Sequence, residues 1–169
     1  MKDYAFPFKF QREPKSNRIF GDGILSGNLS VREETKRYVN IDLSSEIGIE
    51  RTVFDLTSYS GFDLQMLGTK YMICIMASCV SSGYLPFKMR EYYIIAAKKY
   101  SVQPKAVELA ISRAIENINT SDLLRLNMVF DCEIFRRDNT TVSPGSFLSC
   151  VCARLVMLKS HLKGKPYFG

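Results

Sequence analysis

The chain has 169 residues, of which 46% are hydrophobic and 24% charged, and its net charge is +6. This composition suffices for one domain with a sizeable core and excludes a wholly disordered chain. The longest apolar run, Tyr71–Val80, is shorter than the roughly 18 residues of a membrane helix, and the N-terminus has no apolar signal sequence, so we expect a cytoplasmic protein without a membrane segment.

The first 45 residues have the composition of an extended arm. Gly21, Gly23 and Gly27 interrupt short apolar runs, and Tyr38–Leu43 alternates apolar and polar residues with the period of a half-buried strand. The glycines follow no strand and open no helix, which indicates turns rather than a phosphate-binding loop. We therefore expect residues 1–45 to form an extended arm that can include a short β-hairpin and that serves oligomerisation or binds a protein partner.

From residue 46 the apolar residues recur every three or four positions, which predicts helices. Boundary residues, among them Pro104 and the predicted N-cap Ser143, help to set the expected ends. The predicted helices cover residues 46–61, Phe62 or Leu67 to Ser82, 88–100, 104–117, 120–130 and 144–158. The second helix is apolar on most sides and is expected at the centre, and the polar stretch Asp131–Val142 is expected as a loop or hairpin. The sequence thus predicts a mainly α fold, a six-helix bundle at residues 46–162, followed by a tail at 163–169.

The positive charge is concentrated in the C-terminal part of the chain. Residues 1–58 hold nine Lys and Arg and nine Asp and Glu, whereas residues 59–169 hold 14 and eight, respectively. A basic domain beside a neutral segment is typical of a protein that binds a polyanion. A basic surface that only confers solubility is the alternative interpretation.

The strongest functional signal is the pair of predicted helices joined by Ser101–Gln103, which has the form of a helix-turn-helix. In the second helix the apolar residues form one buried stripe, which consists of Val107, Ala110, Ile111, Ala114, Ile115 and Ile118. The opposite face is then exposed and carries Lys105, Glu108, Leu109, Ser112, Arg113 and Glu116. A solvated amphipathic helix without a partner would carry similar charges, but an exposed leucine among them favours a contact.

This exposed face suits the major groove of DNA. Arg and Lys can donate to guanine, Glu can accept from cytosine, and Leu can pack on a thymine methyl group. Lys98 and Lys99, at the end of the preceding helix, are placed to reach phosphates. We therefore expect a homodimer on double-stranded DNA, with contacts from Lys98, Lys99, Gln103, Lys105, Glu108, Leu109, Ser112 and Arg113.

Three stretches of the chain carry a resemblance to a known family: Ile95–Tyr100, Val107–Glu116 and Ser143–Leu148. Over residues 50–160 the sequence resembles the C-terminal DNA-binding (effector) domain of the sporulation master response regulator of endospore-forming bacteria. The resemblance implies a six-helix fold with a helix-turn-helix and a bacterial transcription regulator related to sporulation. We expect no counterpart of that family's receiver domain in residues 1–49, which are too few to form one.

The resemblance also assigns roles to residues of the second helix. It makes Glu108 a base contact, while two arginines of the family correspond to Leu109 and Ser112 and its histidine corresponds to Arg113. A lost bidentate arginine–guanine contact costs about 1–3 kcal/mol of discrimination. The chain is therefore expected to read a different sequence from its relatives. The alternative is a protein–protein interaction module on the same fold with weak or no specific DNA binding.

No catalytic set, cofactor motif or metal-ligand spacing is found in the sequence. The one histidine, His161, has no carboxylate nearby in the sequence. The odd number of cysteines and their apolar neighbours favour reduced thiols that act as small hydrophobic residues. They are Cys74, Cys79, Cys132, Cys150 and Cys152. We therefore expect a protein that is not an enzyme and that uses no metal or cofactor.

Overall fold

Six α-helices pack together in the part of the chain that the computed structural model describes, residues 39–118, 120–130 and 142–162. They are α2 (Glu46–Tyr59), α3 (Leu67–Ser82), α4 (Met89–Tyr100), α5 (Pro104–Glu116), α6 (Thr120–Phe130) and α7 (Pro144–Leu162). No strand occurs in these ranges, so the prediction of six packed helices is confirmed. The arm predicted for residues 1–38, the loop at 131–141 and the tail at 163–169 lie outside the described residues.

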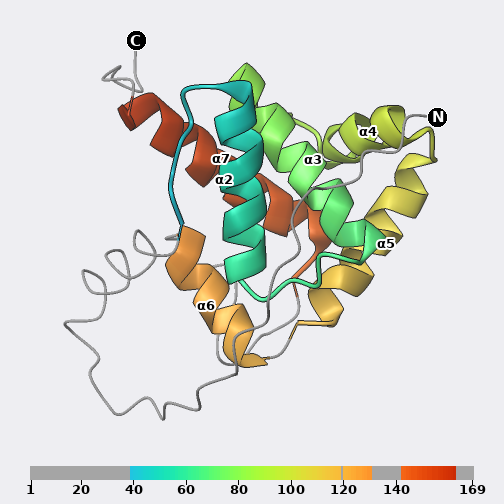
Figure 1. Ribbon diagram of the computed structural model, residues 1–169. Coiled ribbons are helices and arrows are strands. Elements are labelled where there is room, and N and C mark those ends of the chain that lie inside the picture. The colour runs from blue at the N-terminus through green and yellow to red at the C-terminus, as the bar shows by residue number, and fades with distance from the viewer. Residues whose placement is uncertain (1–38, 119, 131–141, 163–169) are drawn as a thin grey trace.

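The central helix is α3, which packs against α2, α4, α5 and α7 (Figure 1). Met72, Ile75 and Val80 on this helix have no exposed surface. Cys74 and Cys79 of α3 and Cys152 of α7 are also buried in the core. The apolar character of α3 on most of its sides therefore follows from neighbours on most of its sides, as the sequence predicts.

Side chains from other helices stabilise the ends of the helices. The ammonium group of Lys159 donates hydrogen bonds to the carbonyl oxygens of Val80 (2.6 Å) and Ser81 (3.0 Å), at the end of α3. Arg154 donates in the same way to Phe130 at the end of α6, over 3.2 Å. Cations are favourable at helix C-termini, where carbonyl groups lack intrahelical partners. Part of the positive excess in the C-terminal part of the chain thus stabilises the fold.

The backbones of α3 and α5 approach each other closely at Gly68. A Cβ atom at this position would overlap the carbonyl oxygen of Ala110 and lie 2.9 Å from the Cβ atom of Ala114. Glycine at 68 and alanines at 110 and 114 therefore allow α5 to lie directly on the central helix. This contact fixes the orientation of the exposed face of α5.

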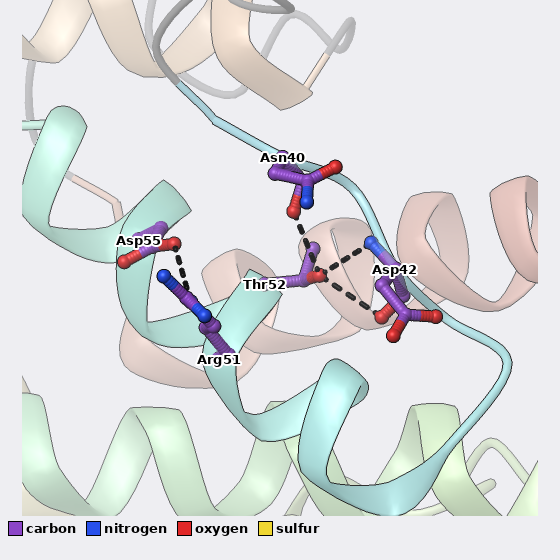
Figure 2. A network of polar contacts seen from close by, with 5 residues as sticks. All are labelled: Asn40, Asp42, Arg51, Thr52 and Asp55. Carbon is purple, nitrogen blue, oxygen red and sulfur yellow. Dashed lines mark hydrogen bonds and ion pairs between the residues drawn. The ribbon is translucent and has the colours of Figure 1, made fainter.

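Residues 39–45 run antiparallel to α2 and are fastened to it (Figure 1). Val39 and Leu43 are buried in the core. The hydroxyl of Thr52 accepts a hydrogen bond from the backbone N–H of Asp42 (2.9 Å) and donates to its carbonyl oxygen (3.0 Å), as Figure 2 shows. The strand predicted at Tyr38–Leu43 is therefore wrong for its described part, residues 39–43. Its apolar residues pack on helices. The hydroxyl of Thr52 forms the backbone hydrogen bonds to Asp42 that a neighbouring strand would otherwise form.

Loss of the Thr52 hydroxyl is expected to destabilise the chain. In Thr52→Val the N–H of Asp42 loses its acceptor, and we expect the free energy of unfolding to fall by about 1–3 kcal/mol. The control is Thr57→Val, because the equally buried Thr57 hydroxyl only donates to the Val53 carbonyl one helical turn earlier. Urea denaturation of both variants checks the prediction, and equal losses would contradict the role given to Thr52.

Candidate nucleic-acid interface

A tight connection of three residues, Ser101–Gln103, joins α4 to α5. Ser101 adopts the left-handed conformation (φ 55°, ψ 44°) and its N–H donates to the carbonyl oxygen of Ala97, which ends α4. Gln103 is extended and Pro104 is the first residue of α5, as predicted. Proline suits this position because its fixed φ is that of a helix and the first N–H has no intrahelical partner. The connection brings the N-terminus of α5 beside α4.

The two faces of α5 differ as its apolar spacing predicts. The buried residues of this helix are Val107, Ile111, Ala114 and Ile115. On the other side Lys105, Leu109 and Arg113 are exposed, and Glu108 and Ser112 are half-buried. Leu109 keeps 49% of its surface exposed, which places an apolar side chain between charged ones. We refer to Lys105, Leu109, Ser112, Arg113 and Glu116 as the outer face of α5.

Weak local pairs hold several polar groups on this helix. The ammonium group of Lys105 lies 2.7 Å from a carboxylate oxygen of Glu108, and the hydroxyl of Ser112 donates to Glu116 over 3.0 Å. Pairs of this kind on a solvated helix contribute only about 0.2–0.5 kcal/mol. No ion pair of Arg113 is found within the described residues. A ligand can therefore bind Lys105 and Arg113 with little loss of stabilising interactions within the protein.

Lys98 and Lys99 lie on a different groove from the residues of α5. Together with Glu46 and Glu50 of α2 and Cys74 of α3, they line a groove of about 660 Å³ to which α5 contributes no residue. Burial raises the pKa of the Cys74 thiol, and the nearby Lys99 acts in the opposite direction. The two glutamates reduce the positive potential at Lys98 and Lys99. The structure thus does not gather all the predicted DNA contacts on one surface.

A second groove, of about 550 Å³, lies where the N-termini of α4, α5 and α7 meet. We call it the three-helix groove; its lining residues are Met89, Arg90, Tyr93, Gln103, Pro104, Lys105, Glu108, Ser143 and Gly145. Three predicted site residues, Gln103, Lys105 and Glu108, meet here. Arg90 and Tyr93 could not be predicted as site residues from the sequence, because only the packing of α4 on α7 brings them to this place.

Comparison with known proteins gives no identification. The chain matches no family model, no curated protein and no solved structure. The resemblance to the effector domain of a sporulation regulator therefore stays a prediction, and the case for a function depends on the geometry of the site.

Two other kinds of feature are absent from residues 39–118, 120–130 and 142–162. In these ranges no three His, Cys, Asp or Glu residues come together as metal ligands would. No helix there combines the length and the apolar character needed to cross a membrane.

Proposed function

We propose that the chain is a sequence-specific DNA-binding transcriptional regulator that inserts α5 into the major groove. In this proposal α4, the turn at 101–103 and α5 act as a helix-turn-helix, and α5 is the recognition helix. The observation that carries the proposal is the outer face of α5. It presents Arg113, Lys105 and Leu109 to solvent on a helix whose opposite face is fixed on the core.

The chemistry of this face matches base edges. Arg113 and Lys105 offer donors for guanine, and Leu109 offers an apolar surface for a thymine methyl group. Glu108 is paired with Lys105, and the remaining lone pairs of its carboxylate can accept from cytosine. We expect binding as a dimer on paired or tandem half-sites, which would repeat the face of α5 along the duplex.

A protein–protein interaction module is the second candidate. The exposure of Leu109 favours it, because a protruding leucine is as well suited to an apolar pocket of a protein as to a thymine methyl group. The carboxylates of Glu108 and Glu116 on the same helix also oppose a polyanion. The two candidates differ in their response to salt, because only DNA binding releases condensed counterions.

In the proposed complex Lys98 and Lys99 contact phosphates. The double variant Lys98→Gln, Lys99→Gln is expected to weaken binding to all duplexes alike and to reduce the slope of log K against log salt by about 1.8. Fluorescence anisotropy with a labelled duplex, at several salt concentrations, measures both quantities.

The control for this variant is Arg51→Glu on α2, which also lowers the net charge by two. Arg51 pairs with Asp55 over 3.9 Å (Figure 2). It lines neither groove. Arg51→Glu should leave the salt slope almost unchanged. A double variant with the slope of the wild-type chain would remove Lys98 and Lys99 from the interface.

A further inference from the structure

The three-helix groove collects unused hydrogen-bond donors. The first N–H groups of a helix have no intrahelical acceptor, and the helix dipole makes that end positive. The N-cap residues of α4 and α5, Lys88 and Gln103, form no side-chain hydrogen bond to these groups. Pro104 has no N–H, and the N–H groups of Glu91 and Ala106 donate to the N-cap carbonyl oxygens over 2.9 Å, so the unused amides are those of Met89 and Arg90 in α4 and of Lys105 in α5. The guanidinium of Arg90, in the first turn of α4, lines the same groove and is exposed.

The groove also contains the hydroxyl group of Tyr93, a donor that is independent of the helix N-termini. Tyr93 is only 7% exposed, and its hydroxyl has no hydrogen-bond partner among the described residues. Tyr93 lines the groove, and a Cβ atom at Gly145 would lie 3.2 Å from its hydroxyl oxygen. Burial and the charge of Glu108 raise the pKa of Tyr93, so the hydroxyl stays protonated and able to donate. The ring of Tyr93 is buried while its hydroxyl reaches the groove, so this donor is available to a ligand.

The charges around this donor favour an anion. Glu108 is the one carboxylate among the residues that line the groove, and it lies 2.7 Å from the ammonium group of Lys105. Arg90 then remains as the excess positive charge. Gly145 keeps the space open, because a side chain there would contact the sulfur of Met89 and the hydroxyl of Tyr93.

We propose that the three-helix groove binds one phosphodiester group of a DNA strand, with Arg90, the hydroxyl of Tyr93 and the N-terminal amides of α4 and α5 as its donors. This inference depends on the proposed function and extends it, since it places the backbone beside α5 while the outer face contacts bases. Such a contact fixes the position of α5 along the duplex and carries no sequence information of its own.

The test compares Arg90→Gln and Tyr93→Phe with the wild-type chain on a mixed-sequence duplex of about 30 base pairs, between about 50 and 200 mM salt. Arg90→Gln should bind about tenfold more weakly and reduce the salt slope by about 0.9. Tyr93→Phe should also bind about tenfold more weakly, but with an unchanged slope, because no charge is lost. Its Tm should not fall, since the hydroxyl has no hydrogen-bond partner in the part of the chain that the structure describes. Arg51→Gln is the control for a lost charge and should match the wild-type chain.

The outcomes separate this inference from the proposed function. If the wild-type chain binds the duplex and both variants bind equally well, the phosphate site is refuted and the proposed function stands. If the wild-type chain does not bind at about 50 mM salt, both are refuted. A Tm that rises with inorganic phosphate in the wild-type chain but not in Tyr93→Phe, together with unchanged duplex binding, would assign the groove to a free phosphate and overturn the DNA assignment.

Discussion

Gly68→Ala is expected to lower the free energy of unfolding by about 3 kcal/mol, the upper end of the usual cost of overpacking. The added Cβ atom would overlap the carbonyl oxygen of Ala110, which belongs to the backbone of α5 and cannot move aside as a side chain can. To accommodate it, α5 must shift away from α3. Urea or thermal denaturation measures the loss, and DNA binding should fall as well, because the outer face changes its orientation.

The control is Gly83→Ala at the other end of α3. Gly83 has a φ of 69° and nothing lies within 4 Å of the Cβ position, so this variant meets strain in its own backbone but no neighbour. We expect it to cost about 1 kcal/mol. If the two variants lose the same stability, the claim that the backbone of α5 leaves no room for a side chain at position 68 is wrong.

Arg113→Glu is expected to weaken binding to DNA about 100-fold at 0.1 M salt. Arg113 is the exposed cation in the last turn of α5, and glutamate there removes a donor to base edges or phosphates and repels the duplex. The effect on folding is small, about 0.5 kcal/mol, because only the favourable interaction of the cation with the end of the helix is lost. Fluorescence anisotropy measures the affinity, and the Tm serves as the check on folding.

Arg51→Glu is again the matched control, because it makes the same change of charge on α2. It should lower the affinity severalfold at most, through the net charge of the chain. An Arg113→Glu variant that binds as well as Arg51→Glu would place the outer face of α5 outside the interface.

The helices could be predicted because their causes are local. A spacing of three and four residues, Pro104 at the start of α5 and Gly83 at the end of α3 all act within a few residues of the chain. The buried and exposed faces of α5 follow from the same spacing. The pair of Lys105 with Glu108 is also a local feature, since residues three apart are neighbours on a helix.

The features that could not be predicted depend on packing between distant segments. In the sequence Gly68 looks like a weak helix former. The reason for a glycine at this position appears only when α5 packs on it and leaves no room for a Cβ atom. Tyr93 looks like one more core tyrosine until its hydroxyl is found without a partner. Val39 and Leu43 fall within the predicted arm, yet they lie in the core. A truncation that tests the arm must therefore begin at residue 39 and not at residue 46.

Selection of DNA fragments by the full chain tests the central claim most directly. Random genomic duplexes are mixed with the protein at low and at moderate salt, and the retained fragments are sequenced. Sequence-specific reading by α5 predicts one enriched motif at moderate salt, because base contacts persist when the phosphate contribution is weakened. The motif should change in Leu109→Arg, which places a guanine-reading side chain on the outer face. Retention without any motif, lost as salt rises, would contradict a sequence-specific regulator.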